Sequence, residues 1–232
     1  MIFLFGLALL LPLAACQTRP FQTVVMYDDP SRFVRLEVDP TVEGNHSHPA
    51  DITTDKMIAV LSGVMIEEPP RFMTSLPSLG KDEEPRRHPA FNEAQISFFA
   101  PFFAEGLRKA TSEEIVTFYQ ASQKDTLIDK VMFVTSGGMF VNGDELHLIL
   151  SNYRSETGYA PDPGIGAKFD GRSTPLQPIA PQQTKVYFEP ATAVAPSQQG
   201  ILKSLLRPDR REIVVLFKKL TNTTSDVGRG LD

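Results

Sequence analysis

Three apolar runs near the middle of the chain constrain its fold more than any other feature. They are Val131–Val134, Met139–Val141 and Leu146–Leu150, and Asn142-Gly143 lies between the last two. Asn-Gly is a favoured pair in tight hairpins, because both residues tolerate positive backbone angles. We therefore expect strands near residues 130–135, 138–141 and 145–153, with a β-hairpin turning at Asn142-Gly143.

Other β-rich runs predict further strands. Phe21–Tyr27 and Phe33–Val38 can form a second hairpin across the short polar stretch between them. In the later run Val34, Leu36 and Val38 share one face of a strand, although Phe33 falls on the polar side by parity. Lys185–Phe188 and Glu212–Phe217 are two more expected strands.

Two segments predict helices. Thr53 or Thr54 can cap a short helix that buries Ile58 and Leu61. Asn92 can cap a second helix, whose apolar residues fall within an arc of about 180°. These residues are Ile96, Phe98, Phe99, Phe102, Phe103 and Leu107. We expect the phenylalanines to be buried, and we expect Pro101 to kink this helix or to start another.

The remaining segments complete the predicted architecture. Thr111–Glu114 matches a helix capping box that leads into the apolar run Ile115–Tyr119. Residues 67–90 are rich in proline and charge and predict a surface loop, and 200–206 predict a short helix. Residues 155–196 are irregular and predict either a loop laid over the domain or a mobile excursion.

Strands that are grouped apart from helices favour an α+β fold, with an antiparallel or mixed β-sheet and a few packed helices. Hydrophobic residues make up 41% of the 232, which suits one globular domain. We place that domain at residues 23–220, followed by a flexible polar tail at 221–232.

The N-terminus has the pattern of an export signal. Ile2–Leu13 is apolar throughout, but it is shorter than the roughly 20 residues that a membrane-spanning helix needs and matches the 7–15 of a signal peptide. The next residues, Leu13-Ala14-Ala15-Cys16, resemble the lipobox of bacterial lipoproteins. An ordinary signal peptide followed by an unmodified cysteine is the alternative.

The resemblance implies that residues 1–15 are removed, that the Cys16 thiol receives a diacylglycerol, and that the new amine receives a fatty acid such as palmitate. Gln17, which is not Asp, implies sorting to the outer membrane in bacteria with two membranes. Residues 16–22 then form a lipidated tether, whose six residues after Cys16 reach about 20 Å. Cys16 is the only cysteine, so neither an intramolecular disulfide nor a zinc site of several cysteines can form.

Charge argues against nucleic acid as a partner, because the net charge is −5 and the predicted signal contains no charged side chain. Two basic clusters, Arg86-Arg87 and Arg207 with Arg210-Arg211, are short and lie among acidic residues or proline. We interpret both clusters as solvated loops.

His46-Ser47-His48 is the best metal candidate, because two imidazoles this close can converge in an extended loop. Zinc still needs a third protein ligand, from His88, His147, Asp51 or Glu43. A polar turn before Pro49 is the favoured interpretation, so we assign no metal and no cofactor.

No other motif predicts catalysis. Ser78 and Lys81 have a Ser-x-x-Lys spacing without the motifs that accompany it in serine enzymes, and Gly164-Ile165-Gly166 lacks the fuller phosphate-loop pattern. Adjacent carboxylates are expected to diverge, because neighbours in a strand or helix point apart. These pairs are Asp28-Asp29, Glu67-Glu68, Glu83-Glu84 and Glu113-Glu114. We therefore assign no catalytic residue.

The sequence thus favours a non-enzymatic envelope lipoprotein on the outer membrane. Its body is expected to face the periplasm and to bind or scaffold another envelope component, a protein partner among the possibilities. The alternative is a membrane-tethered metal-dependent hydrolase that uses His46 and His48.

Overall fold

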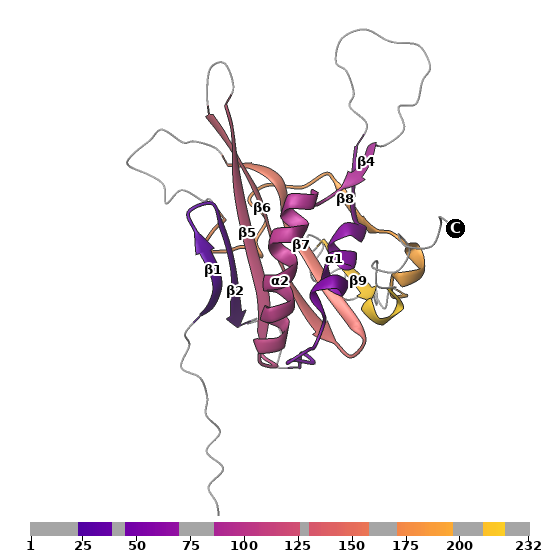
Figure 1. Ribbon diagram of the computed structural model, residues 1–232. Coiled ribbons are helices and arrows are strands. Elements are labelled where there is room, and N and C mark those ends of the chain that lie inside the picture. Colours follow the sequence, from indigo (N-terminus) through magenta and orange to yellow (C-terminus); the bar gives the residue numbers. More distant parts are fainter. Residues whose placement is uncertain are drawn as a thin grey trace, which may run out of the picture.

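Six antiparallel strands form the main sheet, in the order β1-β2-β5-β6-β7-β9 (Figure 1). The computed structural model describes residues 23–38, 45–69, 86–125, 130–157, 171–196 and 211–220. The strands are β1 (Val24–Asp29), β2 (Arg32–Val38), β5 (Glu114–Asp125), β6 (Lys130–Asn142), β7 (Glu145–Thr157) and β9 (Glu212–Leu216).

A second antiparallel sheet has the order β4-β3-β8. Its strands are β3 (Val64–Glu68), β4 (Arg86–Pro89) and β8 (Lys185–Phe188). The fold has two α-helices in its described part, α1 (Thr54–Gly63) and α2 (Glu93–Lys109). Two short 3-10 helices are η1 (Ala191–Ala193) and η2 (Phe217–Lys219). Both α-helices cover the same face of the main sheet (Figure 1). The predicted single-domain α+β fold is confirmed, and every strand pairing in the described ranges is antiparallel.

Both helices begin where their capping residues predict. The hydroxyl of Thr53 accepts a hydrogen bond from the backbone N–H of Lys56, and Asn92 and Gln95 exchange side-chain and backbone hydrogen bonds. The second helix runs unbroken through Pro101, so the prediction that Pro101 starts another helix is wrong. Pro101 is exposed and removes one backbone donor. The packing of α2 on both sides of it outweighs that loss.

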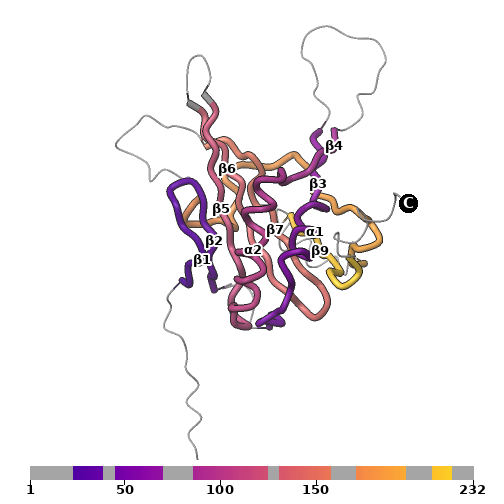
Figure 2. Tube along the Cα trace, in the orientation of Figure 1, coloured from indigo at the N-terminus to yellow at the C-terminus, as the bar shows by residue number. Residues whose placement is uncertain are grey.

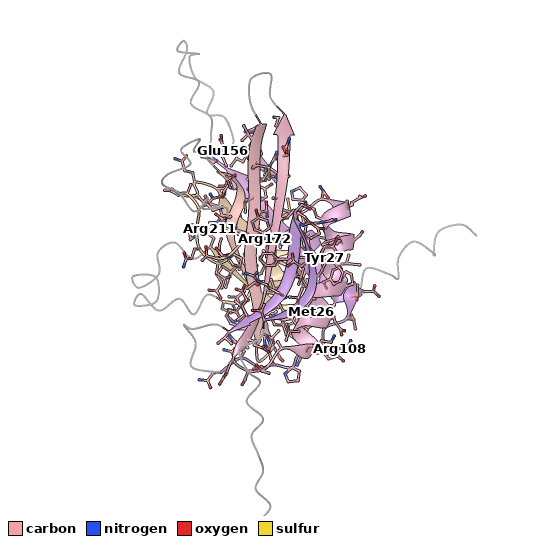
Figure 3. The ribbon with its side chains drawn as sticks, turned by 90° about the vertical axis from the view of Figure 1, so that its left-hand side faces the viewer. Met26, Tyr27, Arg108, Glu156, Arg172 and Arg211 are labelled. Atoms are coloured by element: carbon pink, nitrogen blue, oxygen red, sulfur yellow. The ribbon has the colours of Figure 1, made fainter. Side chains whose placement is uncertain are left out.

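The predicted burial of the phenylalanine face is confirmed. Phe99 and Phe103 are fully buried, and their ring centroids lie 5.7 and 5.3 Å from that of Phe118 on the sheet. Phe102 is half-buried and packs beside Tyr27 of the edge strand, 5.3 Å between centroids. Figure 3 shows Tyr27 on the side of the sheet that the helices cover.

The first hairpin forms as predicted between β1 and β2. Phe33, which breaks the alternation of this strand, is fully buried on the opposite face of the sheet, where its ring stacks on that of Tyr119 at 5.5 Å. The irregular parity therefore reflects a sheet that is covered on both faces.

Residues 114–125 form a central strand rather than the helix that the capping box predicts. Thr111 does donate to the Glu114 carboxylate, through its backbone N–H at 2.8 Å and its hydroxyl at 2.9 Å, but these bonds close a turn. Val116 and Phe118 are buried beneath the helices, while Ile115 and Tyr119 are buried on the other face. A residue run that is apolar on both faces suits a central strand and leaves no polar side for a helix.

The central hairpin is confirmed, with its turn shifted by one residue. Asn142 pairs with Glu145, so Gly143 and Asp144 form the two-residue turn and Gly143 has a φ of 61°. The two strands predicted before it are one, because β6 continues through Gly137. A Cβ on Gly137 would lie 1.9 Å from the carbonyl oxygen of Ile149, so only glycine fits there.

The second face of the main sheet is covered by residues 171–184, which we call the strap. Figure 2 shows this orange segment crossing behind the strands from the β1–β2 hairpin towards β8. Arg172 fixes one end by donating to the backbone oxygen of Asp29, and it lies on the side of the sheet away from the helices (Figure 3). For its described part, the irregular segment is therefore a loop laid over the domain.

A buried amide fixes the middle of the strap. Asn152 is fully buried, and its Nδ2 donates to the Ser136 hydroxyl and to the carbonyl oxygen of Gln177 at 2.9 and 2.8 Å. Its Oδ1 accepts from the backbone N–H of Ile179 at 2.8 Å and from the hydroxyl of Ser155 at 3.2 Å.

Strands β8 and β9 form close to where they are predicted. The signal, tether and tail at 1–22 and 221–232, and the helix expected at 200–206, lie outside the described residues. In the described part, no helix is long and apolar enough to cross a membrane.

Candidate anion-binding pocket

A polar hollow lies where the second sheet meets the end of β7. Its volume is about 520 Å³, and it is lined by Glu68, Arg86, Arg87, His88 and Arg154. We call this hollow the basic pocket. A second hollow of about 400 Å³, beside Ser62 and Phe91, has Glu93 as its only charged lining residue among those described.

Strand pairing brings oppositely charged residues together at the pocket. Strands β3 and β4 are antiparallel, with Glu68 opposite Arg86 and Glu67 opposite Arg87. A guanidinium nitrogen of Arg86 lies 2.5 Å from Glu68, and Nε of Arg87 lies 2.8 Å from Glu67. The hydrogen bond from Arg87 lowers the pKa of the Glu67 carboxyl below its usual value.

An irregularity in β7 places the third arginine in the pocket. The register with β6 shifts between Ser136–Asn152 and Val134–Ser155, so β7 carries an extra residue in a β-bulge. Arg154 lies in this bulge with a φ of 48°, the left-handed region that side chains other than glycine rarely adopt. Its backbone N–H donates to the hydroxyl of Thr135 at 3.2 Å.

The lining groups do not balance in charge. Arg86 faces Glu68, the only carboxylate among the described lining residues, and Arg87 has Glu67 beside it. For Arg154, the described residues provide no carboxylate within ion-pair distance. The pocket therefore has excess positive charge in a chain of net charge −5.

Arg211 lies next to this region, where the end of the strap holds it. It donates from Nε to the carbonyl oxygen of Leu150 at 3.0 Å and from Nη1 to the hydroxyl of Thr184 at 2.6 Å. Its Nη2 is buried and has no hydrogen-bond partner among the described residues. Burial lowers the pKa of Arg211 to about 10, so the group keeps its charge at neutral pH.

Tyr153 and His88 complete the polar surroundings. The Tyr153 hydroxyl lies 3.5 Å from Nδ1 of His88, whose Nε2 lies 3.3 Å from the Glu68 carboxylate. Burial raises the pKa of Tyr153, so its hydroxyl stays protonated and can donate a hydrogen bond. The pocket region thus combines cationic and neutral donors from β4 and β7.

The histidine pair predicted as a metal candidate has a different role. His48 uses both ring nitrogens: Nε2 accepts from the backbone N–H of Val141 at 3.0 Å, and Nδ1 lies 3.3 Å from the carbonyl oxygen of Thr111. Burial lowers the pKa of His48, which favours this neutral state. With its acceptor nitrogen engaged, His48 has no lone pair for a metal.

Residues 46–48 instead extend the sheet beside β6. The backbone N–H of Ser47 donates to the carbonyl oxygen of Val141 at 2.8 Å, and the Ser47 hydroxyl accepts from the N–H of Gly143 at 2.8 Å. His46 is buried, with its ring centroid 4.3 Å from that of Phe140.

The proposed third ligands do not complete a metal site in the described part. His147 stacks on Phe140, and its Nδ1 lies 2.6 Å from a carboxylate oxygen of Glu212. His88 belongs to the basic pocket, and Asp51 is exposed. Among the described residues, no three His, Cys, Asp or Glu side chains are grouped so that they can hold a metal ion.

The other candidates are separated as well. Cys16, Glu43, Ser78, Lys81, Glu83-Glu84 and residues 164–166 lie outside the described ranges. Glu67 and Glu68 have different arginine partners, and Glu114 is buried while Glu113 is exposed. The predicted divergence of adjacent carboxylates is confirmed for these two pairs.

The sequence interpretation missed the basic pocket. It placed Arg86-Arg87 and Arg211 in solvated loops and did not single out Arg154. One signal was present: Glu67-Glu68 followed by Arg86-Arg87 is the order that pairs opposite charges between antiparallel strands. No local pattern marks the bulge at Arg154.

Comparison with known proteins identifies no matching family model, no similar curated protein and no similar solved structure.

Proposed function

We propose that this chain is a non-enzymatic bacterial lipoprotein, anchored in the outer membrane through lipid on Cys16, whose body binds another component of the cell envelope from the periplasmic side. The sequence Leu13-Ala14-Ala15-Cys16 at the end of an apolar run carries this proposal. These residues resemble the lipobox of bacterial lipoproteins.

The position of the folded body suits such an anchor. Strand β1 begins at Val24, eight residues after Cys16, and a chain of this length spans at most about 28 Å. Each acyl chain has roughly a dozen methylenes or more, which contribute on the order of 10 kcal/mol to membrane binding. Two or more chains hold a protein stably, whereas one chain anchors it reversibly.

The polar groups of the body support binding more than catalysis. His48 is fully hydrogen-bonded to backbone, and His147 is held between Phe140 and Glu212. No serine or threonine hydroxyl in the described ranges hydrogen-bonds to a histidine, as the nucleophile of a Ser–His pair does. The hydrolase alternative gains no support from this arrangement.

Labelling of Cys16 tests the anchor. Cells that express the full chain are grown with radioactive palmitate, and the purified protein is weighed by intact mass spectrometry. We expect wild type to incorporate label and to carry the mass of a processed, acylated chain, whereas Cys16→Ser does neither. Unlabelled wild type, or a serine variant that labels equally, contradicts the proposal.

Gln17→Asp is the matched control for sorting. It keeps the thiol, so lipidation should persist, while density-gradient fractionation should show the protein moving from the outer to the inner membrane. If wild type and Gln17→Asp fractionate together, the outer-membrane assignment is wrong even where lipidation is right.

A further inference from the structure

We propose that the basic pocket binds a phosphate group, carried by a soluble phosphorylated molecule or by a lipid headgroup. This inference deepens the binding part of the proposed function by naming a ligand class. It does not depend on the lipid anchor, because every residue that carries it lies in the described body.

Excess charge is the first argument. Three guanidinium groups line the hollow, and two of them have a carboxylate partner, Glu68 for Arg86 and Glu67 for Arg87. For Arg154 no carboxylate in the described part lies within ion-pair distance. Nearby, Arg211 is partly buried with Nη2 lacking a hydrogen-bond partner among the described residues. A cation without a counter-ion is repelled by neighbouring cations, and a bound anion relieves that repulsion.

Backbone strain is the second, independent argument. Arg154 holds a φ of 48° inside a β-bulge, although glycine there would avoid the conflict between Cβ and the backbone. Bulges re-aim side chains next to functional sites, and strained conformations cluster there. This bulge contributes an arginine to the pocket at the expense of local stability.

The arrangement of the donors favours phosphate over carboxylate. Arg86 comes from β4, while Arg154 comes from β7 in the other sheet. Arg87, the strand neighbour of Arg86, is held by Glu67 and by the ring of Tyr187, 5.2 Å from its guanidinium carbon. One arginine satisfies a planar carboxylate with two parallel hydrogen bonds. A phosphate monoester has three acceptor oxygens and a charge near −2, so it can accept from donors on different strands.

Calorimetry on the full-length chain in detergent, in a phosphate-free buffer, tests the proposal with inorganic phosphate as the probe. We expect saturable binding that weakens with added salt and that Arg154→Ala weakens about ten-fold or more. The matched control is Arg108→Ala, which removes the same charge from an exposed helix end. Figure 3 shows Arg108 and Glu156 at opposite ends of the molecule, and Glu156 is two positions after Arg154 in the sequence. This control should change the Kd less than two-fold.

Wild type that releases no binding heat overturns the proposal, as does Arg154→Ala binding as tightly as wild type. Cys16→Ser distinguishes this failure from failure of the anchor, because it should bind phosphate like wild type while it loses the lipid. Acetate tests the ligand class: it should bind at least ten-fold more weakly than phosphate, and equal affinity would assign the pocket to carboxylates instead.

Arg154→Gly separates a binding role from a structural one. Glycine relieves the left-handed strain, so this variant should melt at the wild-type temperature or up to a few degrees above it while losing phosphate affinity. A variant that melts lower and keeps its affinity would show that Arg154 supports the fold and not the ligand.

Vesicles distinguish the two sources of phosphate. Phosphatidylcholine vesicles with and without one-fifth phosphatidic acid are sedimented with Cys16→Ser, which has no lipid of its own but keeps the apolar run at residues 2–13. Sedimentation with phosphatidylcholine alone measures binding through that run, so the co-sedimentation compared below is the excess that phosphatidic acid causes. Co-sedimentation that Arg154→Ala abolishes identifies a lipid headgroup, and phosphate binding without co-sedimentation identifies a soluble molecule. Co-sedimentation that Arg154→Ala leaves intact contradicts binding of the headgroup in this pocket.

Discussion

Replacing Asn152 with alanine should detach the strap from the main sheet. The amide makes four hydrogen bonds, and three of their partners are the Ser136 hydroxyl, the Gln177 carbonyl and the Ile179 backbone N–H. At about 1 kcal/mol each, the four contribute about 4 kcal/mol. Because Gln177 is exposed and Ile179 is only half-buried, water can replace some of the lost hydrogen bonds in the variant. We therefore expect the free energy of unfolding to fall by about 3 kcal/mol.

Urea denaturation followed by far-UV circular dichroism measures this loss. Asn152→Ala should lower the urea midpoint by a large fraction of its value, because domains are stable by only about 5–15 kcal/mol. Ser155→Ala removes the hydroxyl that donates to this amide and accepts from Nε2 of Gln182 in the strap. It should lose about 1–2 kcal/mol, less than Asn152→Ala. If Asn152→Ala loses less than about 0.5 kcal/mol, the network does not hold the strap and the reasoning is refuted.

Two further predictions concern the central hairpin and the histidine beside it. Gly143→Val should destabilise the fold by at least about 1–2 kcal/mol, because a β-branched residue resists a φ of 61°. Gly143→Asn should lose less stability, because asparagine tolerates this backbone angle better. Thermal melting compares the two variants, and equal melting temperatures would contradict a strained turn. Burial lowers the pKa of His48, so this residue stays neutral in the folded protein. In the unfolded chain the same histidine takes up a proton below about pH 6.5. The free energy of unfolding should therefore fall as the pH falls below about 6.5. Gln at position 48 can still accept from the N–H of Val141 but does not titrate, so the urea midpoint of His48→Gln should depend less on pH between 7.5 and 5.5; an unchanged dependence would be inconsistent with a buried neutral His48.

The elements that the sequence predicts well have local signals. The Asn-Gly pair marks the central hairpin, and Thr53 and Asn92 mark both helix starts. The elements that it misses depend on distant contacts. Residues 114–125 become a strand because both faces are covered, and β3 and β4 exist because residues 64–68 and 86–89 find each other across a long connection. The capping box of Thr111 shows the limit of a local pattern, because the hydrogen bond from the Thr111 N–H to the Glu114 carboxylate forms without a helix.

The candidate site shows the same limit more strongly. Two histidines close in sequence predict a shared ligand, yet the fold orients His48 into a backbone hydrogen bond and His46 against Phe140. The charged residues of the basic pocket come from β3, β4 and β7, separated by up to 86 positions between Glu68 and Arg154. Only the Glu-Glu and Arg-Arg pairs carry a sequence signal for this site, and the bulge that supplies Arg154 carries none.

The bulge also links the strap to the basic pocket. Asn152 and Ser155, which hold the strap, immediately flank Tyr153 and Arg154, which face the pocket region. If the strap keeps the bulge in its strained form, Asn152→Ala should let β7 relax and should speed hydrogen exchange at the Arg154 amide, which donates to Thr135. Ser62→Ala, which removes a side-chain bond within α1, should leave that exchange unchanged. Measured by NMR where both variants remain folded, protection of the Arg154 amide that survives Asn152→Ala would show that β7 holds its bulge without the strap. Faster exchange would show that one buried amide supports both the cover of the sheet and the position of the arginine.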